Sequence, residues 1–485
     1  SNRAFDHKRK RGELKMLNLP RKYFSRRAFL GAAAAVGLAA TTGKFFQQAG
    51  AVPSAEKENI ENWRTKFTKE AQRSQTIEGA IVDRNGEPLT EPGDPGTPAK
   101  VLDISYGSLI GLRTAGGELT GLRKTYQEEL VYSTLPGKGA GRTLHLTIDS
   151  ELQKVAYSLI AGTRGTCAVM NARTGSMLAC ATSRGTLEFD VNHYAELYDV
   201  YKREPNFFAD PLITPMAPGS VMKLITASAM LKNGVDMTYY DDGPYHGISN
   251  YGKKRYGKLE LNSAVVHSSN TYFAHGAEMV GTSNFLKEAG QWGFADVVPA
   301  PTVIPSYEGT ALKSSLGLQA DSSEANLRQI GFGQGSALVT PIQVLLWYGA
   351  LALNNDEAVG APHIVDYIED PNTVEDAKYI ETRPALPAMF AGYGKTQETL
   401  RAAFAGAAEA YKLKNDKLKA IYAKTGTATQ PDGKNTVLLA FSFITLSGGS
   451  YAGVVSCSNT EKTSAILKPI ARSLIKTALE LEVIE

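Results

Sequence analysis

The chain has 485 residues, of which 43% are hydrophobic and 21% charged. This composition is that of an ordinary globular protein, and it excludes a wholly disordered one. The formal net charge of +3 is unevenly distributed, because residues 1–27 carry ten Lys and Arg against two acids, a net +8. The rest of the chain is therefore mildly acidic at −5, which argues against nucleic acid as its partner.

An uncharged segment follows the basic one. Ala28–Gly43 is a run of 16 uncharged residues rich in Ala and Gly, and Ala49–Ala51 offers a small-x-small cleavage site. Ser25–Leu30 also resembles a twin-arginine export signal. As a helix the run spans roughly 24 Å, short of a ~30 Å bilayer core. Residues 1–51 therefore predict either a cleaved export signal or a retained, weakly hydrophobic anchor, and both place the body outside the cytoplasm.

The rest of the sequence divides into a polar segment and two folded regions. Residues 52–77 are polar, with two aromatic residues four apart, and predict a helical stalk. Residues 78–143 predict a small mixed domain, since Gly79–Leu89 has the pattern of a strand, an Asn-Gly turn and a second strand. Residues 144–485 form the larger region.

The larger region combines strands that lie far apart in the sequence. It opens with a predicted strand over Leu144–Ile148 and a helix over Ser150–Ile160, and helical stretches dominate up to Leu418. A helix over Glu461–Leu481 closes it. Three further strands are predicted before that helix: Ala420–Ala428, Val437–Thr445 and Tyr451–Ser456. A sheet of distant strands with helices around it indicates an α/β or α+β domain.

The chain has three cysteines, too few for a disulfide scaffold: Cys167, Cys180 and Cys457. The first two lie on the arms of a hairpin predicted over residues 166–181. If Asn171 faces Ser176 across this hairpin, then Cys167 faces Cys180. Two interpretations stay open, a cross-strand disulfide and a pair of buried thiols on one sheet.

A serine and a lysine three residues apart form the first chemical motif, Pro-Gly-Ser-Val-Met-Lys at residues 218–223. Pro-Gly before a helix places Ser220 at the helix amino end, where the dipole and free N–H groups favour developing negative charge. Lys223 shares a helical face with this serine. A partly desolvated lysine in a positive potential can be neutral enough to remove the serine proton. Alone the pattern is weak, because residues 54–57 match it too.

The second motif, Ser268-Ser269-Asn270, lies 48 residues after Ser220. Ser268 can relay a proton between the lysine and a leaving amine. Asn270 offers an amide donor and an acceptor for a peptide substrate. A helix-capping Ser-Asn cluster is the alternative interpretation.

The third motif is Lys-Thr-Gly-Thr-Ala at residues 424–428. Its β-branched residues and Gly426 suit a strand whose backbone a ligand can approach closely. Lys424, with the hydroxyls of Thr425 and Thr427, forms a polar shelf for a carboxylate. The alternative is a surface strand that carries one lysine.

In the order Ser-x-x-Lys, Ser-x-Asn, Lys-Thr-Gly, the three motifs resemble the penicillin-recognising serine enzymes. Further segments resemble the class B penicillin-binding proteins: residues 79–89, 146–149, 189–192, 270–273, 333–335 and 340–343. The likeness covers roughly residues 78–485. It implies an α+β fold, in which a β-lactamase-like transpeptidase domain with a mainly antiparallel sheet between helices (residues 144–485) follows a small mixed pedestal domain (residues 78–143).

The resemblance implies a peptidoglycan D,D-transpeptidase that cross-links stem peptides and is blocked covalently by β-lactams. Ser220 would attack the carbonyl between two terminal D-alanines, Lys223 would act as its base, and Ser268 would protonate the departing D-alanine. The N–H groups of Ser220 and Thr427 would form the oxyanion hole.

Lys424, Thr425 and Thr427 would hold the substrate carboxylate. No metal or other cofactor is implied, and His267 and His275, eight residues apart, lack the spacing of metal ligands. The family resemblance suggests a membrane glycosyltransferase as partner, an expectation that a cleaved export signal would weaken.

One departure from the family pattern predicts a contact. Members usually have Arg-Gly where this chain has Glu78-Gly79, and Gly-Leu-Glu where it has Gly-Leu-Arg ending at Arg123. Both charges are reversed. We therefore expect Glu78 and Arg123 to form an ion pair in which the acid and the base have exchanged positions relative to the family pattern.

Three alternatives to a transpeptidase stay open. A serine β-lactamase or β-lactam sensor shares the motifs but would need a deacylating base, and no Glu or carbamylated-lysine context for one is recognisable. A D,D-carboxypeptidase differs only in using water as the acceptor. A non-catalytic scaffold for wall synthesis is the third, and the intact motifs argue against it.

Overall fold

The computed structural model describes Lys69 and residues 71–484, except 115–116, 133–138, 298–305, 309, 373–377, 380–385, 387 and 390–393. Residues up to Gln75 form one unit and Thr76–Glu485 another, to which the fold below belongs. The predicted export signal and most of the predicted stalk lie outside the described residues. None of the described helices has the length and apolar character needed to cross a membrane.

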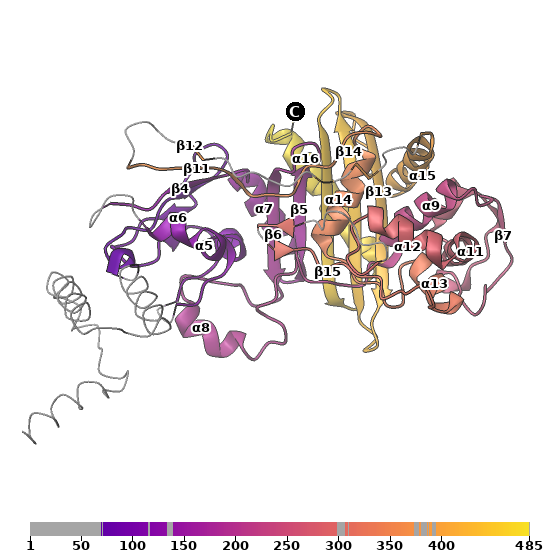
Figure 1. Ribbon diagram of the computed structural model, residues 1–485, viewed down its shortest axis with the longest axis horizontal. Helices are drawn as coiled ribbons and strands as arrows, with labels where there is room; N and C mark the ends of the chain where they lie inside the picture. Colours follow the sequence, from indigo (N-terminus) through magenta and orange to yellow (C-terminus); the bar gives the residue numbers. More distant parts are fainter. Residues whose placement is uncertain are drawn as a thin grey trace, which may run out of the picture. The chain divides into compact units, whose positions relative to one another are not determined.

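A five-stranded antiparallel sheet forms the core of the larger unit (Figure 1). Its strand order is β13-β14-β15-β5-β6, so β13 forms one edge. The strands are β5 (Arg164–Asn171), β6 (Met177–Arg184), β13 (Leu418–Thr429), β14 (Asn435–Thr445) and β15 (Ser450–Thr460). Nearly every residue of β14 is buried, which is expected of a strand covered on both faces.

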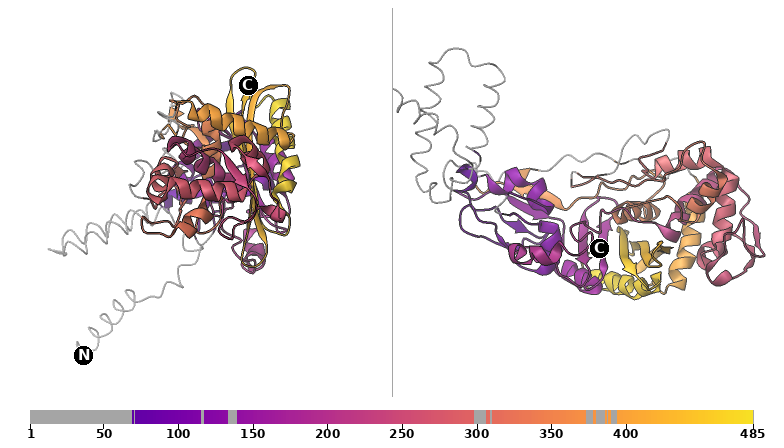
Figure 2. Two further views of the ribbon diagram at one scale, coloured as in Figure 1. Left: turned by 90° about the vertical axis from the view of Figure 1, so that its right-hand side faces the viewer. Right: turned by 90° about the horizontal axis from the view of Figure 1, so that it is seen from below.

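Helices pack on both faces of this sheet, as Figure 2 shows. On one face lie α7 (Ser150–Ile160) and α16 (Leu467–Glu480), which contact each other and the strands. On the other lies α14 (Pro341–Leu351), which contacts β14 and β15 and whose residues are all buried. A helix that is apolar on all sides belongs in such an interior position.

A group of helices lies beside the edge strand β13 (Figure 1). It comprises α9 (Lys223–Lys232), α10 (Leu261–His267), α11 (Asn270–Val280), α12 (Thr282–Gln291), α13 (Glu324–Gly331) and α15 (Thr396–Ala410). The short strands β7 (Tyr239–Asp241) and β8 (Gly257–Leu259) pair next to α11. The helix α15 packs directly on β13, and this brings the edge strand and the helices together.

A second, smaller sheet lies in the amino-terminal part of the unit. Its order is β1-β4-β11-β12, with β1 (Ile81–Val82), β4 (Thr143–Leu146), β11 (Val365–Glu369) and β12 (Lys378–Tyr379). The predicted turn after β1 is present, since the Leu89 N–H donates to the Ile81 carbonyl at 2.8 Å and Gly86 has a φ of +84°. This sheet takes strands from both sides of residue 144, so the pedestal boundary there stays a prediction.

Most elements predicted for the larger region are confirmed, and the helix over Ser150–Ile160 has the predicted bounds. The three predicted late strands are β13, β14 and β15. Helical stretches dominate up to Leu418, as expected, but the prediction missed the short strands β7, β8, β9 (Ser306–Tyr307), β10 (Thr310–Ala311), β11 and β12. These strands have two to five residues, which is too short to show a clear alternation of polar and apolar side chains.

The predicted register of the cysteine hairpin is wrong. A β-bulge shifts the pairing of β5 and β6 between Val169 and Met170, so that Cys167 lies opposite Ala181. A shift of one residue turns a side chain to the other face of a sheet. Cys180 therefore does not face Cys167, and the three cysteines are free, buried thiols.

The predicted ion pair between Glu78 and Arg123 is confirmed. The Arg123 Nε lies 2.6 Å from Glu78 Oε1, and the Arg113 Nη1 lies 3.6 Å from Glu78 Oε2. Both partners are buried, and the Glu78 carboxylate also accepts from the Ala99 N–H at 3.0 Å. Arg123 in turn donates to the carbonyl oxygens of Gly111 and Ala99. The pair thus joins four backbone segments of the amino-terminal region.

Replacing Glu78 with alanine leaves buried guanidinium groups without their carboxylate. We expect Glu78→Ala to lower the free energy of unfolding by about 3–5 kcal/mol, measured by urea denaturation. The control is Glu151→Ala, which breaks an exposed pair with Lys154 (2.7 Å) and should change stability by no more than about 0.5 kcal/mol. Equal, small losses in both variants would contradict a structural role for the buried pair.

Candidate active site

Ser220 lies in a short 3-10 helix, η4 (Gly219–Met222), that leads directly into α9. We call η4 the nucleophile turn, and two glycines allow it to lie close against β13. Gly219 has a φ of +55°, and a Cβ on it would lie 2.8 Å from the Thr427 nitrogen. A Cβ on Gly426 would lie 3.1 Å from the Ser220 nitrogen. Only residues without a side chain allow the nucleophile turn and the strand to approach so closely.

A third glycine, Gly333, forms a backbone hydrogen bond with the nucleophile turn. Gly219 donates its N–H to the Gly333 carbonyl at 2.9 Å. Gly333 has a φ of +95°, and a Cβ there would overlap the Gly219 carbonyl oxygen. The glycine-rich residues 331–335 therefore brace the nucleophile turn, in agreement with the family resemblance stated for Gly333–Gly335.

Lys223 begins α9 and is completely buried. Its ammonium donates to the Ser268 carbonyl at 2.8 Å, to Ser268 Oγ at 3.2 Å and to Asn270 Oδ1 at 2.9 Å. Burial, and then the positive charge of Lys424, hold the pKa of Lys223 well below its ordinary value. A lysine in this position can be neutral and can accept a proton.

Ser268 connects the two lysines to the nucleophile. Its hydroxyl donates to Ser220 Oγ at 3.0 Å and accepts from Lys424 Nζ at 2.9 Å as well as from Lys223. Ser220 is thus linked to Lys223 by hydrogen bonds through Ser268. The sequence predicts instead a direct contact between the lysine and the Ser220 hydroxyl. The residue has a φ of +55° at the end of α10, which turns its side chain into the site.

Asn270 forms hydrogen bonds within the protein through both ends of its side-chain amide. Its Oδ1 accepts from Lys223, and its Nδ2 donates to the Ser249 carbonyl at 3.1 Å. One of the two lone pairs of Asn270 Oδ1 is thus used by the lysine, and the predicted contact with a peptide substrate stays a prediction. Asn250 fixes this arrangement from the loop between β7 and β8, because its Oδ1 accepts the Asn270 N–H at 2.7 Å.

The Lys-Thr-Gly-Thr segment lies in β13 beside the serine. Lys424 is completely buried and donates to Ser268 Oγ, to Tyr411 Oη at 3.3 Å and to the Thr425 carbonyl at 3.1 Å. Thr425 and Thr427 are half-buried. The Thr427 hydroxyl donates to Ser464 Oγ at 3.0 Å and accepts the Ser464 N–H at 3.2 Å.

The outer edge of β13 presents backbone N–H groups to the site. Thr425 donates its N–H to Tyr411 Oη at 3.3 Å, so this group points away from β14. Alternation along an antiparallel strand places the N–H of Thr427 on the same edge. The backbone of Ser220 lies next to it, across Gly426. The two N–H groups predicted to form an oxyanion hole are therefore brought together.

Three residues of the site were not predicted from sequence, namely Tyr411, Ser464 and Asn250. Each holds a motif residue through a hydrogen bond from a segment outside that motif. Tyr411 follows α15, and Ser464 begins η6 (Ser464–Ile466). A lone tyrosine, serine or asparagine carries no local pattern, so only the fold could reveal them.

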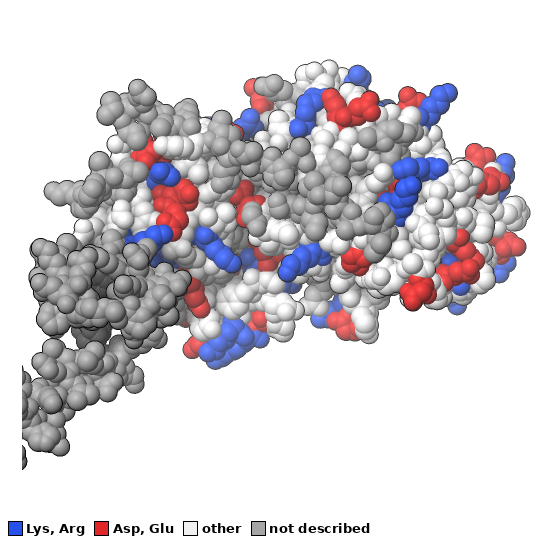
Figure 3. Space-filling view, in the orientation of Figure 1, with Lys and Arg blue, Asp and Glu red and all other residues white. Residues whose placement is uncertain are grey.

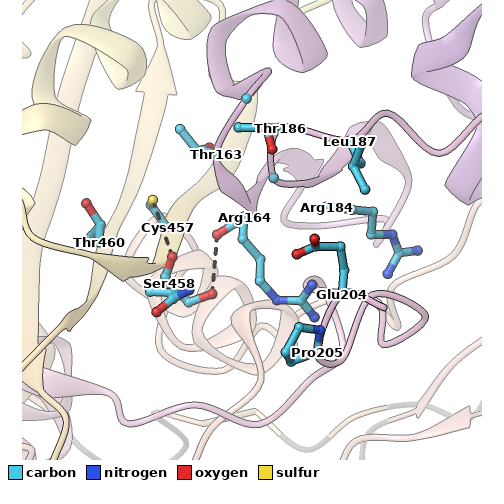
Figure 4. A pocket seen from close by; sticks show the side chains of 13 residues that line it. Thr163, Arg164, Arg184, Thr186, Leu187, Glu204, Pro205, Cys457, Ser458 and Thr460 are labelled. Atoms are coloured by element: carbon cyan, nitrogen blue, oxygen red, sulfur yellow. Dashed lines mark hydrogen bonds between the residues drawn. The ribbon is translucent and has the colours of Figure 1, made fainter. Parts of the chain in front are cut away.

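Other polar clusters lie apart from this site. A hollow at the ends of β5, β6 and β15 is lined in part by Arg164, Arg184 and Glu204 (Figure 4). Arg164 donates to the Asn206 carbonyl at 2.6 Å and Arg184 to Ser108 Oγ at 3.1 Å, so both arginines form hydrogen bonds with neighbouring segments of the protein. On the face in Figure 3, basic and acidic side chains are interspersed. Among the described residues no group of His, Cys, Asp and Glu could hold a metal ion.

The site combines a serine at a helix amino end, a lysine of lowered pKa, a relay hydroxyl and paired backbone donors. This combination defines a class of proteins, the serine-based acyl-transfer enzymes, which need a nucleophile, a base and an oxyanion hole. A family model described as the penicillin binding protein transpeptidase domain matches residues 165–476. The chain belongs to this family.

Curated relatives bear related names. The chain is 26% identical over 269 residues to "Penicillin-binding protein 3" of Bacillus subtilis, with 49% of this chain and 39% of that protein covered. It is 29% identical over 256 residues to "Peptidoglycan D,D-transpeptidase MrdA" of Haemophilus influenzae, with 47% and 37% covered. The chain thus spans less than half the length of these relatives.

Solved structures share the fold, and the predicted α+β class is confirmed. The D,D-transpeptidase domain of a peptidoglycan glycosyltransferase from Eggerthella lenta matches with a TM-score of 0.72 at 21% identity, covering 84% of this chain and 99% of that one. Penicillin-binding protein A from M. tuberculosis, as an imipenem acyl-enzyme complex, matches with a TM-score of 0.69 at 19% identity and the same coverage.

A methyl group on Gly426 would push the nucleophile turn away from β13. We expect Gly426→Ala to slow acylation by a β-lactam by about 100-fold, because displacing a nucleophile by about 1 Å has an effect of that size. The rate is measured with a fluorescent penicillin. The control is Gly349→Ala in α14, where a Cβ would meet its neighbours at an ordinary 3.5 Å. Similar rates in the two variants would show that the close approach is dispensable.

Proposed function

We propose that the chain is a serine D,D-transpeptidase that cross-links peptidoglycan stem peptides through an acyl-enzyme on Ser220. The observation that carries the proposal is the chain of hydrogen bonds from Ser220 through Ser268 to the buried Lys223. The names of the curated relatives and the acyl-enzyme complexes among the structural neighbours support the same chemistry.

Acylation begins when Ser220 Oγ attacks the carbonyl carbon between two terminal D-alanines. For this step the Ser268 hydroxyl turns its hydrogen from Ser220 to neutral Lys223, so that the Ser220 proton passes to Ser268 and the Ser268 proton passes to Lys223. The negative charge that develops on the carbonyl oxygen is stabilised by the N–H groups of Ser220 and Thr427, each worth about 2.7–4 kcal/mol in other acyl-transfer enzymes.

Collapse of the tetrahedral intermediate breaks the peptide bond. The departing amine of D-alanine takes a proton from Ser268, which is reprotonated by Lys223. The proton that left the nucleophile therefore ends on the leaving group, and Lys223 returns to its neutral state. Because burial and Lys424 disfavour the charged form of Lys223, this return is favourable.

The carboxylate of the terminal D-alanine is held at β13. Lys424 supplies the positive charge, and the hydroxyls of Thr425 and Thr427 turn from Tyr411 and Ser464 to donate to the carboxylate when it binds. Ser464 orients the Thr427 hydroxyl through two hydrogen bonds. Asn270 contributes by holding Lys223 in place, and its second amide hydrogen stays available to the peptide.

The acyl group is then transferred to an amine of a neighbouring stem peptide, which regenerates Ser220. A β-lactam presents its ring carbonyl in place of the peptide bond and forms a stable ester with Ser220. Neither the acylation of Ser220 nor the transfer of the acyl group needs a metal or another cofactor.

The proposed substrate and the amino-terminal sequence both indicate that the protein acts outside the cytoplasm. Peptidoglycan lies outside the cytoplasm, and residues 1–51 have the pattern of an export signal or anchor. The proposal therefore includes an extracytoplasmic site of action, with a stalk over residues 52–77 and a pedestal over residues 78–143. A membrane glycosyltransferase that supplies the glycan strands is the proposed partner.

Intact mass spectrometry after treatment with a β-lactam tests the nucleophile. We expect the wild type to gain the mass of one β-lactam and Ser220→Ala to gain none. Ser228→Ala serves as a control, because Ser228 is a buried serine whose hydroxyl donates to Glu288 at 2.7 Å, outside the site. This control should be labelled like the wild type.

The lifetime of the adduct separates the transpeptidase from a β-lactamase. A hydrolytic enzyme would lose the added mass within seconds, whereas the transpeptidase should retain it. Labelling of Ser220→Ala, or failure of the wild type to be labelled at all, would overturn the proposed function.

A further inference from the structure

Tyr411 is a buried residue that follows the last turn of α15, next to the outer edge of β13. Three donors converge on its phenol oxygen. They are Lys424 Nζ at 3.3 Å, the Thr425 N–H at 3.3 Å and the Thr425 hydroxyl at 3.1 Å. A phenol oxygen that accepts from one ammonium and two further donors is placed to stabilise positive charge.

The charged and titratable groups around Tyr411 come from three elements. From β13 comes Lys424, and from α16 come Lys468, whose Nζ lies 4.5 Å from the centre of the Tyr411 ring, and Arg472, which donates to the Tyr411 carbonyl at 3.0 Å. From α14 comes the phenol of Tyr348. In the described part of the chain, neither Lys424 nor Lys223 forms an ion pair with a carboxylate.

We propose that Tyr411 is a positioning residue that holds the Lys424 ammonium against Ser268 and beside Lys223. Through that charge it also keeps Lys223 neutral, and so ready to act as the base. The inference rests on the proposed function for its consequence in acylation, while the contacts of Tyr411 are independent of it.

The electrostatics agree with this geometry. Burial by itself would raise the pKa of Tyr411, but the charge of Lys424 and the hydrogen bonds from Thr425 and Lys424 outweigh burial and lower it. The charge of Lys424 is also the second cause, after burial, of the lowered pKa of Lys223. Tyr411 and Lys223 are therefore coupled through the one ammonium group between them.

The Tyr411 phenol also limits which backbone N–H groups on the outer edge of β13 can bind a peptide. Because Tyr411 occupies the outward N–H of Thr425, the next outward N–H along β13 is that of Thr427, beside Ser220. A bound peptide that pairs with this edge is thereby directed to the oxyanion position.

The test compares Tyr411→Phe with the wild type in the pH dependence of β-lactam acylation. The rate falls on the acid side as Lys223 is protonated. Without the phenol oxygen, the Lys424 ammonium is held less closely beside Lys223, so the pKa of Lys223 rises. We expect the acid limb to move to higher pH by on the order of half a pH unit, with slower acylation below it.

The control is Tyr201→Phe, which removes another buried hydroxyl that donates to the Glu188 carbonyl at 2.9 Å and accepts the Asp190 N–H at 3.0 Å. It lies in α8 (Tyr194–Tyr201), outside the site, and should leave the acid limb in place. Thermal unfolding establishes that both variants are folded. An acid limb that is unmoved in Tyr411→Phe, while the wild type acylates normally, would overturn the proposal.

A second measurement does not depend on acylation. The difference in near-ultraviolet absorbance between wild type and each variant during alkaline titration reports the ionisation of one tyrosine. We expect Tyr411 to ionise below the ordinary tyrosine value of about 10, and Tyr201, whose pKa burial raises, above it. Ionisation of Tyr411 at or above that value would overturn the inference. A wild type that is never acylated, with this titration as expected, would count against the proposed function instead.

Discussion

The amino groups of two lysines, Lys223 and Lys424, meet at one serine hydroxyl in the interior of the protein. Removing a charge from water costs several kcal/mol, and two like charges near each other cost more. The least costly arrangement is one charged and one neutral lysine. Burial and the neighbouring charge of Lys424 lower the pKa of Lys223, so Lys223 is the lysine that becomes the base, while a phenol, a hydroxyl and a carbonyl hold Lys424 in place.

The fold serves to keep this contact in place. The edge strand β13 carries Lys424, the helices beside it carry Lys223 and Ser268, and three glycines remove the side chains that would hold them apart. The fully buried α14 and the helices on the opposite face leave the sheet little freedom to adjust. The amino-terminal region is held by its own buried ion pair between Glu78 and Arg123.

The sequence predicted the groups that do the chemistry but not the contacts that tune them. Ser220, Lys223 and Lys424 were found because each lies in a short motif with a fixed spacing. Tyr411 reaches its partners only through the packing of α15 on β13, so no spacing reveals it. The contact of Asn270 with Lys223 joins residues 47 apart in the sequence, so no motif predicted it. The cysteine register failed because one extra residue in a strand leaves no mark in the pattern.

The central claim, that Lys223 is neutral because it is buried beside a charged lysine, can be tested without any substrate. Lysine side chains labelled with carbon-13 are titrated by NMR in the wild type and in Lys223→Arg. The account predicts one lysine signal that titrates well below the ordinary lysine value of about 10.4 and is absent from the variant. A wild type in which every lysine titrates near that ordinary value would contradict it.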